Sequence, residues 1–203
     1  MAGIAKQIDI SALPQWLEHA ERLLTNMTFE PAMKACQIIV VSATTKNFQT
    51  GVGPNGQSWP PPKMRAGKPL YDTGVLMASV TASGAGHTGG TTDTTLTWGT
   101  NLEYAQIHQY GGTIVPVNAK ALAVPLTSEA KRSGGPRRMG DLHMVWPNGK
   151  PSGTLRDSSG KAQFALVKSI TIPARPFLGW NEDMADECGE IIGDYAEQQI
   201  AKK

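Results

Sequence analysis

The stretch TNLEYAQIHQYGG, residues 100–112, and the stretch IPARPFLG, residues 172–179, together decide the fold that we expect for this chain. The first gathers aromatic and aliphatic side chains over residues 104–110 and ends in Gly111 and Gly112, which enter left-handed backbone geometry freely. The second places an arginine between two prolines and then continues with phenylalanine, leucine and glycine. Both compositions are typical of apolar corners at which a chain turns sharply, and neither resembles a reaction centre.

Two helices are predicted ahead of these corners. Apolar residues recur at helical spacing over residues 13–24, and again from Thr28 or Glu30 to about Phe48. Residues 50–62, TGVGPNGQSWPPP, are predicted to be a loop, because prolines interrupt both helices and central strands. Trp59 in this loop has two open interpretations: the indole fills the edge of the core, or it anchors a partner subunit.

A β-hairpin is predicted to follow the loop. Residues 70–80 indicate a short helix that runs into a strand over residues 79–85. Residues 84–92, GAGHTGGTT, are interpreted as a long, flexible, polar tip. Residues 94–100 are the return strand, because apolar and polar residues alternate there.

Two histidines near the hairpin are weighed as functional residues. His87 lies in the predicted tip and is expected to be solvated rather than a ligand. His108 shares a face with Tyr104 on a predicted helix that begins at Leu102. A catalytic role for His108 would need a partner such as Glu103, and no nucleophile with motif spacing lies nearby. A hydrogen-bonded structural histidine is therefore the favoured interpretation.

The second half of the chain is predicted to contain strands, an insertion and a terminal helix. Residues 113–126 are rich in strand formers, and residues 163–172, QFALVKSITI, form the clearest strand pattern. Residues 127–160 show little periodicity and are interpreted as an insertion with one or two short strands or a β-hairpin. Pro176 is predicted to begin a helix, and residues 181–201 are the C-terminal helix.

The predicted fold class is therefore α+β. A small antiparallel sheet with a long β-hairpin is flanked by N-terminal helices and a C-terminal helix. The 203 residues are expected to form one domain, with an insertion at residues 120–168. Cys36 and Cys188 are expected to be small buried thiols rather than a disulfide or a metal pair.

Composition excludes few functions, but the positive charge is clustered. The formal net charge of +2 is too small to indicate a nucleic-acid-binding protein by itself. Two loops carry runs of basic residues, and each is either a solvated surface or a contact with an acidic subunit or with DNA. These basic residues are Lys63, Arg65, Lys68, Lys131, Arg132, Arg137 and Arg138.

The chain lacks the motifs of common enzyme classes. It has no dinucleotide-binding or phosphate-binding glycine loop, no CxxC pair and no zinc-protease or nucleophile-elbow motif. The four histidines fall in separate predicted elements, so no metal and no cofactor is expected. No apolar run is long enough to span a membrane, and we expect a soluble protein without a standard secretion signal.

Four ordered motifs resemble those of a known family. They are F-x-x-G-x-x-P-x-G-x-x-W-P-P at residues 48–61, L-x-x-T-G-x-L-x-x-S at 70–79, W-G-T-N-x-x-Y-A-x-I-H-Q-x-G-G at 98–112 and I-P-A-R-P-F-L-G at 172–179. Each motif alone is weak, but the ordered set is similar to the virion morphogenesis proteins of Mu-like tailed phages. That G-protein family is related to the tail completion and head–tail joining proteins of other long-tailed phages.

The resemblance implies a non-enzymatic structural protein of the virion neck or tail end, made in the host cytoplasm. It implies a homo-oligomeric ring, with six copies favoured, around the DNA channel. The neighbours would be the head–tail connector and the tail tube or terminator proteins, with non-specific contact to genomic DNA and no membrane. The alternatives are a transient assembly factor that is absent from the mature particle and, least favoured, an enzyme or cell-wall-directed activity that uses His108.

The resemblance implies no catalytic residues in this chain. It implies that the matched positions define the corners of the fold or contact neighbouring subunits. It also implies that one of the two basic runs faces the DNA in the lumen of the ring. The matched positions are Trp59, Tyr104, Ala105, His108, Gly111, Gly112, Pro173, Arg175, Pro176 and Phe177.

Overall fold

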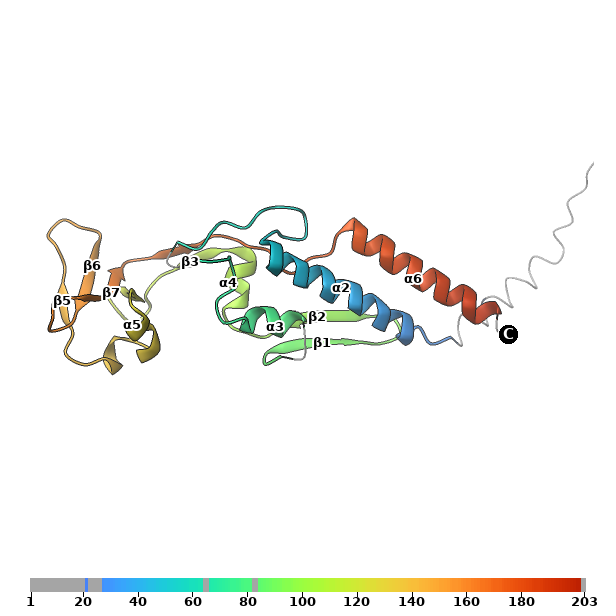
Figure 1. Ribbon diagram of the computed structural model, residues 1–203, viewed down its shortest axis with the longest axis horizontal. Coiled ribbons are helices and arrows are strands. Elements are labelled where there is room, and N and C mark those ends of the chain that lie inside the picture. Colours follow the sequence, from blue (N-terminus) through green and yellow to red (C-terminus); the bar gives the residue numbers. More distant parts are fainter. Residues whose placement is uncertain (1–20, 22–26, 64–65, 82–83, 202–203) are drawn as a thin grey trace, which may run out of the picture.

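The computed structural model describes residues 21, 27–63, 66–81 and 84–201. These residues form an elongated α+β molecule, which confirms the predicted class (Figure 1). The helix predicted over residues 13–24 lies outside the described residues except for residue 21, which is helical, and Arg65 also lies outside them. Two long helices and a β-hairpin occupy one part of the molecule, and a four-stranded sheet lies at the opposite end of its long axis (Figure 1).

Helix α2, Glu30–Thr50, confirms the second predicted helix. It buries every fourth residue, a spacing that keeps one narrow stripe against the core. The helix ends at Gly51, whose φ of 72° allows its N–H to donate to the Asn47 carbonyl at 2.9 Å. The C-terminal helix α6, Glu182–Ala201, packs beside α2 and runs in the opposite direction (Figure 1). The buried residues of α2 are Ala32, Cys36, Val40, Thr44 and Phe48.

The hairpin differs from the prediction in where it turns. Helix α3, Val75–Thr81, includes the start of the segment predicted as a strand, because helical spacing buries Leu76 and Val80 together in the core. Strand β1, His87–Thr91, lies within the segment predicted as a flexible tip, and it pairs with β2, Leu96–Thr100. The ladder is formed by main-chain groups, so a glycine-rich polar segment supports it without apolar side chains.

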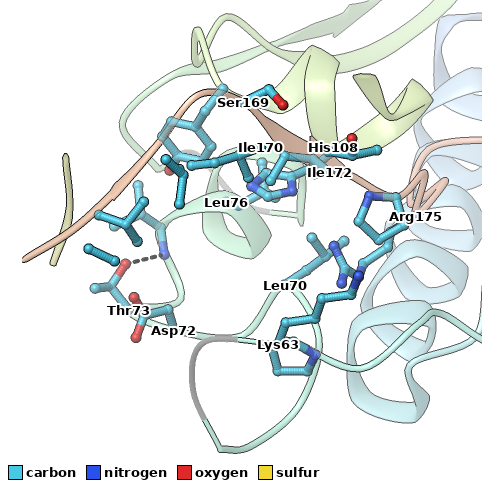
Figure 2. Close-up of a pocket in the computed structure, with 18 of the residues that line it drawn as sticks. Lys63, Leu70, Asp72, Thr73, Leu76, His108, Ser169, Ile170, Ile172 and Arg175 are labelled. Carbon is cyan, nitrogen blue, oxygen red and sulfur yellow. Dashed lines mark hydrogen bonds between the residues drawn. The ribbon is translucent and has the colours of Figure 1, made fainter. Parts of the chain in front are cut away.

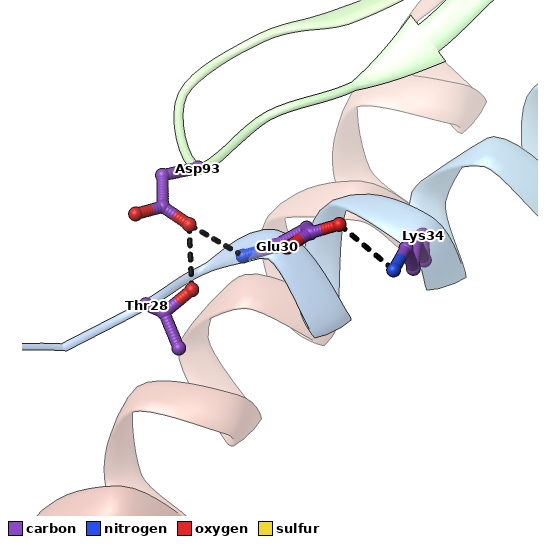
Figure 3. Close-up of polar contacts among 4 residues, drawn as sticks. All are labelled: Thr28, Glu30, Lys34 and Asp93. Carbon is purple, nitrogen blue, oxygen red and sulfur yellow. Dashed lines mark hydrogen bonds and ion pairs between the residues drawn. The ribbon is translucent and has the colours of Figure 1, made fainter.

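The hairpin turn occurs at residues 92–95 and caps helix α2. The Asp93 carboxylate accepts hydrogen bonds from the Thr28 hydroxyl at 2.6 Å and from the Glu30 N–H at 3.2 Å (Figure 3). Phe29, at the N-cap position, supplies no side-chain hydrogen bond of its own. A residue distant in sequence therefore satisfies one of the free N–H groups at the start of α2. His87, predicted to be solvated, is half-buried, with Nδ1 3.0 Å from the Ser79 carbonyl oxygen.

A short ladder connects the two parts of the molecule. Helix α4, Ala105–Tyr110, leads into β3, Gly112–Ile114, and β3 pairs antiparallel with β8, Ile170–Ile172. The chain leaves the helical part along β3 and returns to it along β8. The segment predicted as one strand over residues 163–172 is therefore two strands in different sheets, since β7, Ala162–Val167, belongs to the distal sheet.

The distal sheet falls within residues 120–168. It has the antiparallel order β4-β7-β6-β5, in which β4 is Leu122–Pro125, β5 is His143–Val145 and β6 is Ser152–Arg156. The β5–β6 pair matches the predicted hairpin. Helix α5, Ser128–Ser133, and the 3-10 helix η1, Pro136–Arg138, were not predicted, because two short helices with a single buried residue leave no apolar periodicity.

Helix α6 confirms the C-terminal helix predicted over residues 181–201. Pro176 was predicted to start a helix, but residues 173–179 contain no helical turn. The prediction is wrong because the main chain of this segment bonds to the loop and to α4 instead of to itself. Asn181 then caps α6, with its side-chain oxygen accepting from the Met184 N–H at 3.0 Å.

Candidate functional site

The loop 51–62, helix α4 and segment 172–179 meet at one corner beside the base of β3 and β8. Trp59 is buried there, and its indole N–H donates to the Pro176 carbonyl at 2.9 Å. The Phe48 ring lies between two aromatic neighbours, with centroids 5.6 Å from both Trp59 and Phe177. The indole thus fills the edge of the core and has its polar group satisfied within the same chain.

Arg175 is a buried cation at this corner. Its side chain is only 6% exposed, and its guanidinium donates to the carbonyls of Pro60 at 2.7 Å and Pro61 at 3.2 Å. Its main-chain N–H donates to the His108 carbonyl at 2.8 Å. A buried charge needs such partners, so Arg175 fixes the diproline loop and α4 relative to segment 172–179.

Gln109 also connects these segments, although the sequence analysis assigned it no role. Its side-chain oxygen accepts from the N–H groups of Phe177 and Leu178 at 3.0 and 3.1 Å, and its amide donates to the Leu178 carbonyl at 2.7 Å. The side chain therefore takes the place of a strand partner for Phe177 and Leu178, which lie beyond the end of β8. The sequence offered one indication that Gln109 has a structural role, which is its position directly after His108 in the I-H-Q motif.

Two glycines make the turn from α4 into β3. Gly111 has a φ of 73° with a ψ of 178°, a combination that only glycine adopts without strain. A Cβ at Gly111 would lie 2.8 Å from the main-chain nitrogen of Ala174. Gly112 follows with a φ of 158°, which is close to extended backbone. The close approach of segment 172–174 therefore requires glycine at position 111.

A cavity of about 710 Å³ opens beside the corner (Figure 2). It lies between the segment 70–76, helix α4, the distal sheet and strand β8, and most of its wall is apolar. The titratable side chains in the wall are Lys63, Asp72, Tyr104, His108 and Arg175. Tyr104, which is 44% exposed, packs edge-on against the His108 ring at a centroid distance of 6.1 Å.

His108 faces this cavity as a neutral side chain. Burial lowers the pKa of His108 below its ordinary value of 6.5, and the nearby Arg175 charge lowers it further. The Nδ1 atom is buried and has no hydrogen-bond partner. Glu103, considered as a catalytic partner, does not line the cavity. Among the described residues there is also no cluster of three or more side chains that could hold a metal ion.

A sequence model of the phage virion morphogenesis family matches residues 8–197 of this chain. The chain belongs to that family. A curated relative, the Mu-like prophage FluMu G protein 2 of Haemophilus influenzae, is 38% identical over 82 residues. This match covers 40% of the chain and spans about half of the relative, 52% of its length. No solved structure matches the chain.

In this phage morphogenesis protein the basic residues fall into two places. Lys63 and Lys68 are exposed near the corner, and the Lys68 ammonium donates to the Gln49 carbonyl at 3.0 Å. Lys131 and Arg132 lie on α5, and Arg137 and Arg138 lie on η1. Lys131 pairs with Asp72 at 2.6 Å, a contact that ties α5 to the loop before α3. Asp72 thus lies between the two basic runs, because it lines the same cavity as Lys63 and pairs with Lys131.

The two cysteines of the protein come together between α2 and α6. Both are buried free thiols, and the Cys36 sulfur lies 3.8 Å from the Cys188 carbonyl oxygen. Burial is the main cause that raises the pKa of Cys188, with the neighbouring Cys36 thiol adding to it. The pair is therefore part of the helix–helix packing. In the part of the chain that the structure describes, no helix is both long and apolar enough to cross a membrane.

Proposed function

We propose that this chain is a structural component of a tailed-phage virion, which forms a ring at the neck or tail end around the DNA channel. The family match supports a role in virion morphogenesis. The ring, its position and its copy number, with six favoured, are our extension of that role. The neighbours in this arrangement are the head–tail connector and the tail tube or terminator proteins.

The corner supports a role that depends on shape rather than on catalysis. Its polar side chains bond to main-chain groups of other segments: Trp59 to Pro176, Arg175 to Pro60 and Pro61, and Gln109 to Leu178. Groups that are committed in this way are poorly placed to move protons or attack a substrate. A rigid corner between a helical part and a distal sheet suits a subunit that must hold two surfaces at a fixed spacing.

Exposed apolar residues supply surfaces for neighbouring proteins. In the connection from β3 to β4, Val115 is 57% exposed and Val117 is 89% exposed, and Tyr110 at the end of α4 is 74% exposed. These exposed apolar residues fall within eight positions of the sequence, and contiguous exposed apolar surface is typical of interaction sites. They are consistent with contacts that form only in the assembled particle.

The test is to locate this chain in purified particles. Mass spectrometry of purified virions should detect it, and electron microscopy of the neck should show its density as a ring around the channel. A chain that is needed for assembly but absent from the purified particle would instead be a transient assembly factor. A His108→Ala protein that is folded but supports no infectivity, with normal particles, would favour the enzymatic alternative and oppose the structural one.

A further inference from the structure

Helix α6 presents a strongly acidic face that is exposed among the residues the structure describes. Its buried side chains, Met184 and Cys188, face α2, and the acidic side chains all lie on the exposed surface. No lysine or arginine occurs within residues 182–201. We call the exposed carboxylates of α6 the acidic face, and they are Glu182, Asp183, Asp186, Glu187, Glu190, Asp194 and Glu197.

The acidic face is unfavourable for the isolated helix. Asp186, Glu190 and Asp194 follow one another at i,i+4 spacing, at which like charges destabilise a helix. Gly189 and Gly193 lie on the exposed surface of this helix, with nothing within 4 Å of where their Cβ atoms would be. A cationic partner would relieve the repulsion and find an open surface.

The same chain carries a cationic surface whose charge is opposite to that of the acidic face. Arg132 on α5 and Arg137 and Arg138 on η1 are exposed, and we call these residues the basic tip. Gly134 and Gly135, with φ values of 73° and 140°, turn the chain between the two short helices and so bring their ends together. All residues of the basic tip are arginines, whose planar guanidinium groups bind carboxylates in a bidentate manner.

The two surfaces lie at opposite ends of the molecule. Helix α5 lies beside the distal sheet, and α6 lies at the far end with α2 (Figure 1). The basic tip of one chain therefore reaches the acidic face only in another copy. We propose that the acidic face of one subunit binds the basic tip of the next. A contact between different surfaces of identical subunits is heterologous, and it closes into a ring when the rotation between subunits allows.

This inference rests on the proposed ring and specifies how its subunits meet. It also gives the two basic runs different roles, because the basic tip would bind the acidic face of a neighbouring subunit. Among the described residues of the other basic run, Lys63 and Lys68 are then candidates to face DNA.

The experiment uses the full-length chain and charge reversal on each side. One variant carries Arg132→Glu, Arg137→Glu and Arg138→Glu, and the other carries Asp186→Lys, Glu190→Lys and Asp194→Lys. Light scattering and sedimentation measure the mass of each in low and high salt. We expect either variant to associate at least about tenfold more weakly than the wild type, whose association should weaken in high salt. An equimolar mixture should recover a mixed assembly, since each variant then offers the charge that the other lacks.

A charge-matched control separates this contact from net charge. Lys46, Lys150 and Lys161 are exposed lysines outside both surfaces, and their combined change to glutamate should leave association unchanged. The inference would be overturned if the basic-tip variant associated as strongly as the wild type. It would also be overturned if that variant lost affinity for DNA but assembled normally. A wild-type chain that stays monomeric in low salt would also overturn it. The proposed ring is judged separately, by the image of the virion neck.

Discussion

Gln109 and Leu178 form a closed pair of hydrogen bonds, in which the Gln109 amide donates to the Leu178 carbonyl at 2.7 Å and its oxygen accepts from the Leu178 N–H at 3.1 Å. This geometry reproduces the pairing of neighbouring strands with a side chain in place of a second main chain. It holds segment 172–179 against α4 at the point where β8 returns from the distal sheet. These contacts act together with the β3–β8 ladder, which leads to the distal sheet.

Replacement of Gln109 by alanine should destabilise the protein strongly. The change removes the partners of the Phe177 and Leu178 N–H groups, and a part-buried amide left without a partner is costly. We expect the free energy of unfolding to fall by about 2–3 kcal/mol. Urea denaturation would measure it. Gln106→Ala, at an exposed position of the same helix, is the matched control and should change stability by less than about 0.5 kcal/mol. Equal effects of the two changes would contradict the role assigned to Gln109.

Gly111→Ala should be more damaging than a glycine substitution at an open site. The new Cβ would lie 2.8 Å from the Ala174 nitrogen, and the backbone would keep a conformation that alanine resists. Together these effects should cost more than about 3 kcal/mol. Gly56→Ala isolates the backbone cost, because Gly56 has a φ of 77° with no atom near its Cβ position. That control should lose only about 1–2 kcal/mol. Thermal unfolding of both variants checks the difference.

The neutral state of His108 predicts a pH dependence of stability. Burial and the Arg175 charge lower the pKa of His108 in the folded protein below its ordinary value of 6.5. Above the unfolded-state pKa, His108 is neutral in both states, and the folded protein has its full stability with respect to this group. As the pH falls below about 6.5, the unfolded chain binds a proton that the folded chain does not, so stability declines until the folded-state pKa is reached.

His108→Gln should remove part of this decline. We expect the loss of stability between neutral and mildly acidic pH to be smaller in the variant than in the wild type. Denaturant unfolding across that range measures it. His143→Gln, at an exposed position on β5, is the matched control and should keep the wild-type profile. An unchanged profile in His108→Gln would show that His108 does not drive the dependence.

The elements that the sequence predicted are those with dense apolar periodicity. The extent of α2 could be read because its buried residues recur every four positions. Strand β1 was misplaced because its ladder rests on the main chain of a glycine-rich segment, which carries no side-chain pattern. Helix α5 was missed because only Ala130 is buried, and its cap, Thr127, is one of many threonines.

The corner was predicted as a corner, but its contacts were not. Aromatic, proline and glycine residues signal a sharp turn on their own, so Trp59 and Gly111 could be singled out. The side chain of Gln109 bonds to residues 68 and 69 positions away, and that of Arg175 bonds to residues 114 and 115 positions away. No local sequence pattern encodes such pairs. The cavity could not be predicted for the same reason, since its wall comes from five separate stretches of the sequence.

The buried thiols should react slowly while the protein is folded. Burial, with the Cys36 thiol and the Glu187 charge adding to it, raises the pKa of Cys188 to about 12. Because the thiolate is the reactive form, we expect labelling of Cys188 at mildly alkaline pH to be roughly a thousandfold slower than in unfolded chains. A Cys36→Ser protein reports Cys188 alone. Rapid labelling of that protein without denaturant would show that α6 separates from α2 under native conditions.

Asp93 should stabilise α2 from the hairpin turn, and a double-mutant cycle can isolate that contribution. Asp93→Ala removes the acceptor for both the Thr28 hydroxyl and the Glu30 N–H, so it should cost about 1–2 kcal/mol, as the loss of a helix cap does (Figure 3). Asp93→Asn keeps an oxygen acceptor and should retain most of the stability. Thr28→Val removes only one of the two bonds, and its effect should vanish when Asp93 is already alanine, because the two residues share that bond. Additive effects in the cycle would mean that the turn and the start of α2 are not coupled. Coupling, in contrast, would explain why a polar glycine-rich hairpin stays folded: its tip is held by the helix that it caps.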